Sequence, residues 1–452
     1  MKIEQLYTGC LAQGAYYIES DGEVAIIDPL REIQQYIDKA EANNSKIKYI
    51  LETHFHADFV SGHLDLSNKT NATIVFGPGA STDYDIHSAT DGEELKIGKV
   101  TIKVLHTPGH TLESTTYLLK DENGKDHAIF SGDTLFLGDV GRPDLAIKSD
   151  LTKEDLAAML FKSLRSKIMT LSDDVIVYPA HGAGSACGKN LSKETVGVLG
   201  EQKKTNYALR EDMTKAEFIK EVLDGIAPPP QYFAKNAMLN KMGYDAFDSI
   251  LKTGDTALNP REFETLANHK SALVLDVRPE SEYIKGHIPN SIFIGLNGGF
   301  APWVGALIKD IKQPIVLVVP EGRSAEAVTR LSRVGYDNTL GYLDGGIKAW
   351  ISSGKEIDTL ESISAEEFAN RAKASDINIL DVRKDGEFKS MHLENAQHLS
   401  LDFINEKMNE VSKDKTYYVH CGGGYRSVIA ASILKARGFN NLIDIASGFG
   451  AI

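Results

Sequence analysis

Short apolar runs separated by polar turns dominate the first half of the chain, and they predict buried strands. The clearest runs cover residues 24–28, 49–51, 128–130 and 175–178. Each run ends in a loop with reactive side chains, such as Asp133 and His181. Open sheets place ligands on such loops, past the carboxyl ends of their strands. The pattern therefore predicts a functional site along one edge of a sheet.

A polar stretch from about residue 193 to 242 has the composition of helices. It is interrupted by Pro228-Pro229-Pro230, which cannot continue a helix and favours an extended connection. We expect this stretch to end the first domain and to lead into a linker near residues 252–254.

The second half of the chain repeats itself. Residues 273–291 match 377–396, and residues 315–336 match 417–439. In each copy apolar strands alternate with helices, which predicts a parallel sheet covered on both faces. A repeat of this length indicates a duplicated domain and not a solenoid unit.

Size and charge limit the function classes. The chain has 452 residues, which suggests about three domains. The formal net charge is −14 and the acidic residues are scattered, so nucleic acid and anionic membranes are poor partners. The sequence has no apolar run of about 18 residues, and its first residues lack an apolar stretch, so we expect neither a membrane-spanning segment nor a signal peptide.

The cysteines are odd in number and far apart. Cys10, Cys187 and Cys421 do not form a disulfide framework, and they indicate reduced thiols in a cytoplasm. We therefore expect a cytoplasmic protein.

The segment Thr53-His54-Phe55-His56-Ala57-Asp58 has the spacing of a metal-binding loop. In an extended loop the two imidazoles point to the same side and converge. Pro108-Gly109 forms a tight turn that presents His110. Together with the strand-end residues Asp133 and His181, these side chains predict a metal site.

These motifs resemble those of the persulfide dioxygenases, a branch of the metallo-β-lactamase superfamily with an αββα sandwich. The resemblance covers residues 1–245 and includes THFHADFVSGH (53–63), TPGH (107–110), SGDTLF (131–136), GRPD (141–144) and YPAHG (178–182). It implies one Fe(II) per chain, held by His54, His110 and Asp133. This two-His-one-carboxylate set leaves iron positions open for substrate and O2. The resemblance also implies that His56, Asp58 and His181 orient ligands or bound water.

Phe59 stands where two-metal members of the superfamily have another histidine. A phenyl ring cannot ligate, so the residue favours one metal ion. The alternative is that Phe59 simply packs, while Asp58, His181 and a shared Asp133 still hold a second ion. Iron is favoured over zinc because zinc offers no redox step.

The last copy carries the loop Cys421-Gly422-Gly423-Gly424-Tyr425-Arg426-Ser427 between a strand and a helix. The glycines allow successive N–H groups to point at the sulfur at a helix N-terminus, and such surroundings stabilise a thiolate. The thiolate would attack a sulfane sulfur and hold it as a cysteine persulfide. With Asp381-Val382-Arg383, the loop resembles that of rhodanese sulfurtransferases over residues 360–452, with Cys421 and Arg426 as catalytic residues.

The middle copy, residues 258–356, resembles rhodanese as well, through LDVR (275–278), GHIP (286–289) and LDGGIKAW (343–350). Its loop, residues 319–324, has no thiol, is one residue shorter, and contains Pro320, which lacks an N–H donor. We expect this domain to be inactive and to serve as a spacer or docking surface.

Two further residues have two alternative roles each. Cys187 lies in a glycine-rich loop after His181, where it is either a sulfur relay beside the iron or a bystander. Arg142 either contacts an anionic substrate or forms a structural ion pair. Cys10, next to an expected strand, is interpreted as structural.

The sequence thus predicts an α/β protein: a metallo-β-lactamase αββα sandwich followed by two rhodanese-like α/β domains with parallel sheets. The predicted function is oxidation of a low-molecular-weight persulfide with O2 to sulfite and thiol, coupled to sulfur transfer among persulfide, sulfite and thiosulfate. The resemblance also suggests a homo-oligomer, a dimer or tetramer. The alternatives are a two-zinc thioester hydrolase of glyoxalase II type fused to rhodanese, and a sulfur carrier or sensor with a structural metal.

Overall fold

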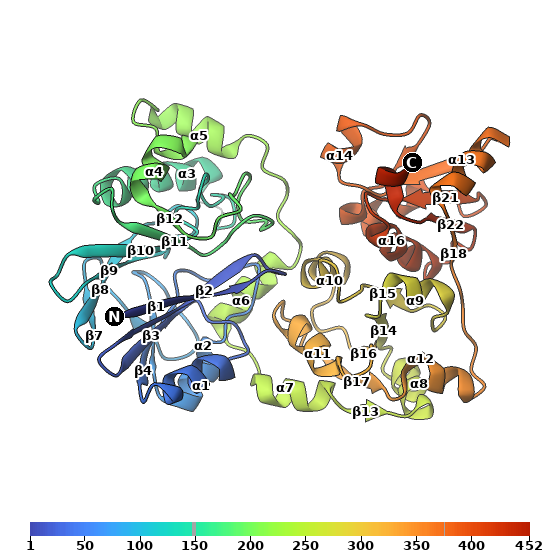
Figure 1. Ribbon diagram of the computed structural model, residues 1–452, viewed down its shortest axis with the longest axis horizontal. Coiled ribbons are helices and arrows are strands. Elements are labelled where there is room, and N and C mark those ends of the chain that lie inside the picture. The colour runs from blue at the N-terminus through green and yellow to red at the C-terminus, as the bar shows by residue number, and fades with distance from the viewer. Residues whose placement is uncertain (147–150, 375) are drawn as a thin grey trace. The chain divides into compact units, whose positions relative to one another are not determined.

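The computed structural model describes residues 1–146, 151–374 and 376–452 (Figure 1). It divides into two compact units. One unit contains residues 1–247 and 333–335, and the other contains residues 248–332 and 336–452.

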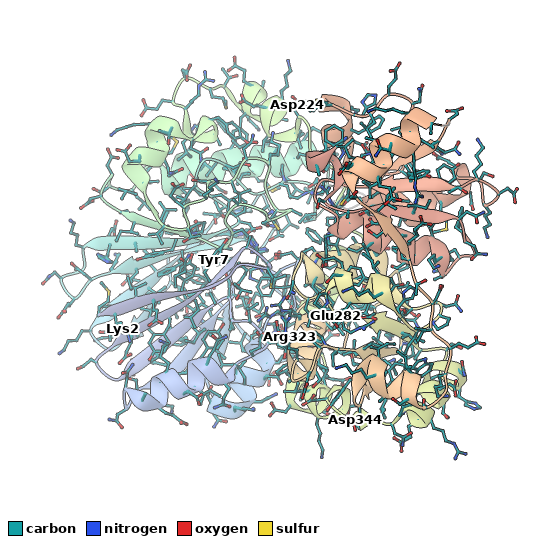
Figure 2. All side chains as sticks on the ribbon, turned by 45° about the vertical axis from the view of Figure 1, so that its right-hand side comes forward. Lys2, Tyr7, Asp224, Glu282, Arg323 and Asp344 are labelled. Atoms are coloured by element: carbon teal, nitrogen blue, oxygen red, sulfur yellow. The ribbon has the colours of Figure 1, made fainter. Side chains whose placement is uncertain are left out.

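The first unit is built around two six-stranded sheets. The first sheet runs in the order β1 (Lys2–Thr8), β2 (Gln13–Ser20), β3 (Glu23–Ile27), β4 (Lys46–Leu51), β5 (Thr73–Phe76) and β6 (His87–Ser88). The second runs in the order β12 (Gly197–Val198), β11 (Ile176–Pro179), β10 (Asp126–Gly132), β9 (Thr115–Lys120), β8 (Val100–His106) and β7 (Glu94–Ile97). In Figure 2, Lys2 and Tyr7 mark the two ends of β1, the edge strand of the first sheet.

The two sheets pack face to face through one apolar core. Tyr16 and Ile18 of β2, Val104 of β8 and Phe130 of β10 belong to it and are almost fully buried. Side chains alternate between the two faces of a strand, so each sheet also has an outer face. The apolar residues on that outer face must be buried by other elements.

Helices supply that cover. On the first sheet, α1 (Gln34–Ala42) and α2 (His63–Thr70) bury Tyr36 and Leu66. On the second, α3 (Lys153–Ser163) and α5 (Lys215–Leu223) bury Leu160 and Phe218. The layers are therefore helix, sheet, sheet, helix, and the expected αββα sandwich is confirmed.

The polar stretch after β11 differs from the expected pattern. It forms several short helices: α4 (Leu199–Thr205), α5, α6 (Phe233–Met242) and α7 (Phe247–Gly254). The prolines at 228–230 separate α5 from α6, as expected. The linker predicted near residues 252–254 is wrong, since these residues form the last turn of α7. Lys252-Thr253-Gly254 therefore marks the end of a helix and not an extended connection.

The second unit contains two five-stranded sheets, and all their strand pairs are parallel. The first has the order β13 (Ala257–Leu258), β17 (Thr339–Leu343), β16 (Ile315–Val318), β14 (Leu273–Asp276) and β15 (Ile292–Phe293). The second has the equivalent order β18 (Glu361–Ile363), β22 (Leu442–Ile445), β21 (Tyr417–His420), β19 (Asn378–Asp381) and β20 (Gln397–His398). The duplication seen in the sequence is therefore a duplication of the fold.

The first four helices of the two copies correspond, whereas the last position has an α-helix in the first copy and a short 3-10 helix, Gly448–Ala451, in the second. The first copy has α8 (Pro260–His269), α9 (Glu280–Lys285), α10 (Phe300–Leu307), α11 (Ser324–Ser332) and α12 (Gly346–Ser352). The second has α13 (Ala365–Ala374), α14 (Asp385–Ser390), α15 (Ile404–Lys407) and α16 (Tyr425–Lys435). In the part of the chain that the structure describes, no helix combines the length and apolar character that a membrane crossing needs.

Candidate functional site

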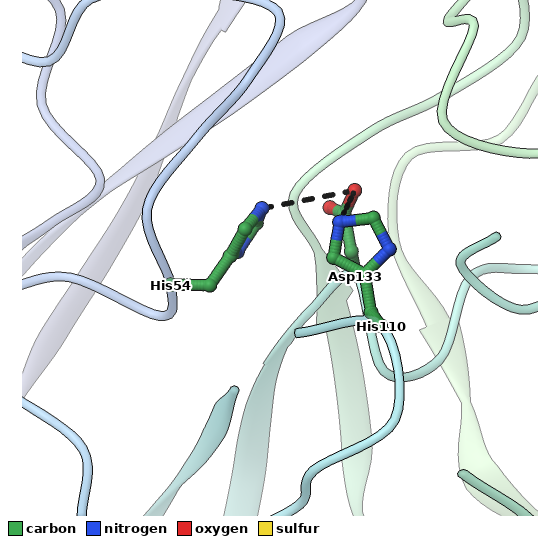
Figure 3. Close-up of side chains that lie close together, drawn as sticks. All are labelled: His54, His110 and Asp133. Atoms are coloured by element: carbon green, nitrogen blue, oxygen red, sulfur yellow. Dashed lines mark ion pairs between the residues drawn. The ribbon is translucent and has the colours of Figure 1, made fainter. Parts of the chain in front are cut away.

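Three strand-end loops of the first unit bring His54, His110 and Asp133 together (Figure 3). His54 follows β4, His110 follows β8, and Asp133 follows β10. Both imidazoles direct Nε2 at Asp133 Oδ2, at 3.9 Å from His54 and 3.3 Å from His110. All three side chains are buried. The loops thus gather two imidazoles and one carboxylate around a single point.

Hydrogen bonds on the far side of each ring fix which nitrogen faces that point. The Thr53 hydroxyl donates to Asp28, so it accepts from His54 Nδ1, which lies 3.0 Å away. The Arg142 carbonyl accepts from His110 Nδ1 at 2.8 Å. Both Nε2 atoms therefore keep a free lone pair, as metal-ligating histidines do.

The donor set fits a divalent cation. Both Asp133 oxygens are buried and have no hydrogen-bond partner among the described residues. Leaving a buried carboxylate without a partner is costly, and a cation between it and two imidazole lone pairs removes that cost. Two histidines and one carboxylate are the ligand types that non-haem iron(II) takes.

A second group, His56, Asp58 and His181, lies next to the first. His181 Nε2 is 3.4 Å from Asp58 Oδ2 and 3.5 Å from Asp133 Oδ1. Its Nδ1 faces the Ala12 carbonyl at 3.2 Å. These residues therefore adjoin the site through Asp133.

His56 differs from His54 in what it faces. The two rings are adjacent, with centroids 4.2 Å apart. However, His56 Nε2 lies 3.1 Å from Asp28 Oδ1 and 3.5 Å from Glu52 Oε2. Burial opposes protonation, but these carboxylates raise the pKa of His56 to about 9. Burial and neighbouring imidazoles lower the pKa of His54 well below its ordinary value, which keeps it neutral.

Asp28 and Glu52 were not among the predicted site residues. A signal for both was present, because Asp28 ends an apolar run and Glu52 immediately precedes the metal-loop motif. Their pairing with His56 depends on β3 and β4 lying side by side.

Phe59 is fully buried, and its ring centroid lies 4.3 Å from that of His56. Asn240 of α6 fixes the same loop, since its amide nitrogen donates to the carbonyls of His56 and Phe59, each at 2.8 Å. Phe59 therefore has a defined packing role beside the metal-loop histidines.

Cys187 lies at the edge of the same site. Its sulfur and the ligand atoms of Asp133 and His181 all lie within 4.8 Å of one another. Burial, with the Asp58 and Asp133 carboxylates, raises the pKa of the Cys187 thiol well above its ordinary value. Without a cation nearby, this thiol would be protonated at neutral pH.

Arg142 reaches the site through its backbone. Its guanidinium forms two hydrogen bonds with Asp144, at 2.6 and 2.7 Å, and contacts the carbonyls of Ala186 and Ala227. Its amide donates to the Cys187 carbonyl at 3.0 Å. The residue thus connects the His110 turn to the Cys187 loop.

In the second unit, Cys421 follows β21 and its loop ends at α16. The Gly424 N–H donates to Cys421 Sγ at 3.1 Å, and Ser427 Oγ lies 3.7 Å from the sulfur. Gly424 has a φ of 92°, which a side chain would disfavour. Phe449, from the last turn of the domain, donates its N–H to the Cys421 carbonyl at 2.7 Å. The loop therefore directs an N–H group at the sulfur.

Arg426 turns towards α14. Its guanidinium donates to both oxygens of Glu387, at 2.6 and 2.8 Å. This pairing lowers the pKa of Glu387 to about 2. In the middle copy the equivalent Arg323 pairs with Glu326 of its own helix, beside a loop without a thiol.

Family models match both parts of the chain. The model "Metallo-beta-lactamase superfamily" matches residues 8–181, and "Rhodanese-like domain" matches residues 259–353 and 364–452. A hydroxyacylglutathione hydrolase of Rhodopseudomonas palustris is 30% identical over 45% of this chain and 86% of its own length. The chain belongs to the metallo-beta-lactamase superfamily. It joins a domain of that superfamily to two rhodanese-like domains.

Other relatives of this metallo-beta-lactamase superfamily member carry different names. The persulfide dioxygenase ETHE1, mitochondrial, of Bos taurus is 28% identical over 46% of this chain and 74% of its own length. A probable hydroxyacylglutathione hydrolase of Schizosaccharomyces pombe is 32% identical over 39% of this chain, which spans 66% of that relative. A crystal structure of a metallo-beta-lactamase from Staphylococcus aureus is 33% identical, covers 75% of this chain and 98% of its own, and has a TM-score of 0.68.

Proposed function

We propose that the protein is a persulfide dioxygenase fused to a rhodanese sulfurtransferase. The observation that carries the first activity is the buried group of His54, His110 and Asp133 with its unpartnered carboxylate. Similarity to the bovine persulfide dioxygenase supports it. The overall reaction consumes one persulfide, one O2 and one water, and yields sulfite, the parent thiol and two protons.

Iron(II), one per chain, would be held by His54, His110 and Asp133. When bound, it supplies the redox chemistry and the open coordination positions that oxygen transfer to sulfur requires. Thr53 and the Arg142 carbonyl orient the two imidazoles, whose Nε2 lone pairs would then be available to the ion.

The neighbouring side chains would act around that ion. The unpartnered atoms of His181 and Asp58 suit a role in orienting substrate or water. His56, held by Asp28 and Glu52, would stabilise the metal loop. Burial of the whole group excludes bulk water from the reacting sulfur.

We propose that Cys187 and Arg142 act where the substrate would bind. The Cys187 sulfur lies close enough to Asp133 to take part near the iron, where its thiolate would attack the outer sulfur of a persulfide, form a new S–S bond and release the parent thiolate. Arg142 would act mainly by joining the His110 turn to the Cys187 loop, because its guanidinium already binds Asp144.

Cys421 would carry the second activity. Its thiolate attacks the outer sulfur of thiosulfate, a new S–S bond forms, and sulfite leaves with the electron pair of the old bond. The cysteine persulfide then passes that sulfur to an acceptor thiolate. The Gly424 N–H stabilises the sulfur anion, and Arg426 would assist by holding the loop against Glu387.

The fusion suits this chemistry. Holding both sites in one chain raises the local concentration of a shared sulfite or persulfide above that of two separate proteins. We take residues 1–245, 258–356 and 360–452 as the dioxygenase, the inactive rhodanese-like domain and the active rhodanese. The three free thiols support a cytoplasmic setting, and a dimer or tetramer is proposed for the assembly.

A thioester hydrolase of glyoxalase II type is the second candidate. It is supported by the hydroxyacylglutathione hydrolase relatives and by the adjoining His56, Asp58 and His181, which suit a second ion. Such an enzyme would use two zinc ions and a bridging hydroxide.

One experiment separates the two. Protein purified without oxygen is analysed for metals, and O2 uptake is then followed with a panel of persulfides, with sulfite and thiosulfate separated as products. One iron per chain with stoichiometric O2 uptake is expected. Two zinc ions per chain, no O2 uptake and hydrolysis of a glutathione thioester would contradict the dioxygenase.

A further inference from the structure

Tyr425, inside the Cys421 loop, binds the middle rhodanese-like domain. Both copies belong to the same compact unit. The Tyr425 hydroxyl donates to the Gly295 carbonyl of the middle copy at 2.7 Å. Its ring meets Phe293 edge-on, with centroids 5.8 Å apart. Burial raises the pKa of Tyr425, so the hydroxyl remains a protonated donor at neutral pH.

The middle copy is shaped to receive this ring. A Cβ atom on Gly298 would lie 2.3 Å from Tyr425 Cζ, far inside van der Waals contact. The ring therefore lies directly against the backbone of the middle domain. Only a residue without a side chain fits at position 298.

A second contact joins the middle copy to α16, the helix that begins at Tyr425. The Phe293 N–H of β15 donates to Ser432 Oγ of α16 at 3.0 Å, and both atoms are buried. Ser432 lies seven residues after Tyr425, so the two residues share one face of α16. The middle domain thus binds α16 at its first residue and again two turns later.

The position of Tyr425 matters for the sulfur. Tyr425 is the first residue of α16, and the preceding Gly424 donates its N–H to Cys421 Sγ. The N-terminus of a helix stabilises an anion only when its N–H groups point at that anion. A shift of Tyr425 would therefore move the Gly424 N–H away from the sulfur.

The duplication provides an internal comparison. The two loops align at Arg-Ser, which places Gly322 of the middle copy opposite Tyr425. A Cβ atom on Gly322 would meet none of the described residues within 4 Å. The tyrosine is thus a feature of the copy that has the thiol.

We propose that the thiol-free middle domain is a docking platform that positions the Cys421 loop, with Tyr425 as the positioning residue. The proposal rests on the sulfurtransferase function proposed for Cys421. It assigns the middle domain a role in the chemistry of its neighbour, although its own loop, residues 319–324, has no thiol.

The test uses three variants of the full chain. Tyr425→Phe removes only the hydroxyl, and Gly298→Ala pushes against the ring. Tyr336→Phe is the matched control, because its buried hydroxyl donates to the Ile308 carbonyl inside the middle domain. Two quantities are measured: the pH profile of Cys421 alkylation by iodoacetamide, followed on the Cys421 peptide by mass spectrometry, and kcat and KM with thiosulfate.

We expect Tyr425→Phe to slow alkylation at pH 7 and to lower kcat by about 3- to 10-fold, the factor that corresponds to one ordinary hydrogen bond. The alkylation profile should shift to higher pH. Gly298→Ala should have a larger effect, and Tyr336→Phe should leave alkylation and kcat within about twofold of wild type.

Wild-type alkylation profiles and kcat in both Tyr425→Phe and Gly298→Ala would overturn the proposal, as would an equal loss in all three variants. If one of the two variants does not fold, the other decides. Full sulfurtransferase activity in Cys421→Ser would instead overturn the proposed function, while the alkylation profile would still report on positioning.

Discussion

Phe59 is the side chain that separates the two candidate metal stoichiometries. It is fully buried and its ring contacts His56, which forms a group with Asp58 and His181. A histidine there would add a nitrogen donor to a group that already contains two others.

Phe59→His is therefore expected to raise the metal content from one ion per chain towards two when the protein is reconstituted with zinc. The measurement is metal analysis after dialysis. Phe55→His is the matched control, because Phe55 lies in the same loop but its ring contacts Phe76, with centroids 4.6 Å apart. Equal metal content in both variants would show that residue 59 does not decide the stoichiometry.

Glu387 gives a pH-dependent contribution to stability. Arg426 lowers its pKa in the folded protein to about 2, below the ordinary 4.5. Its contribution is therefore fully present above about pH 4.5 and is lost as the pH falls towards 2.

Glu387→Gln should lower the free energy of unfolding at pH 7, and the difference from wild type should vanish as the pH approaches 2. Urea unfolding at pH 7, 5, 4 and 3 measures it. Glu282→Gln, at the equivalent and largely exposed position of the middle copy, is the control. A difference from wild type that stays constant with pH would contradict the assignment.

Among the larger elements, the turn that presents His110 depends on α3. Gly109 has a φ of 148°, and a Cβ atom there would lie 2.4 Å from Leu160 Cα. Ser163 of the same helix donates to the Pro108 carbonyl at 2.8 Å. The turn and the helix are thus packed backbone to backbone.

Gly109→Ala should displace His110 and weaken metal binding by about 10- to 100-fold, the range found when ligand-supporting residues are changed. Competition with a chelator measures the affinity. Gly124→Ala is the control, since Gly124 also has a positive φ, 78°, but none of the described residues lies within 4 Å of its Cβ position. If Gly109→Ala binds metal as tightly as Gly124→Ala and wild type, the contact with α3 does not position His110.

Across the entire chain, the two proposed activities reside in different domains. His110→Ala should abolish O2 uptake, with a loss of at least about 100-fold, and should leave sulfur transfer from thiosulfate to a thiol intact. Cys421→Ser should show the reverse.

Both rates are measured on each full-length variant, with a thermal unfolding scan to exclude misfolding. Loss of all turnover in Cys421→Ser, with His110→Ala fully active, would favour a sulfur carrier whose metal is structural. This pair of variants therefore tests the fused-enzyme proposal as a whole.

Several features were visible in the residues alone. Short continuous apolar runs between polar turns predicted the strands, because a strand buried on both faces is apolar at successive positions. The repeated Asp-Val-Arg strand ends revealed the duplicated domain, and the H-x-H-x-D spacing with the strand-end Asp133 indicated a metal site. The absence of a thiol from the loop of the middle copy could also be read from the sequence Val319-Pro320-Glu321.

Other features depend on contacts between residues distant in the sequence. Glu52 and Asp28 meet His56 because β3 pairs with β4, and α6 reaches back through Asn240 to fix the metal loop. Tyr425 meets Gly295 only because the two copies pack together, 130 residues apart in the chain.

Local patterns reflect local forces: backbone geometry, burial and the chemistry of each side chain. Which distant groups become partners is decided by the packing of whole elements, and no spacing along the chain encodes it. That is why the candidate ligands were recognisable one by one, whereas the carboxylates behind His56 and the platform beneath Cys421 emerged only in three dimensions.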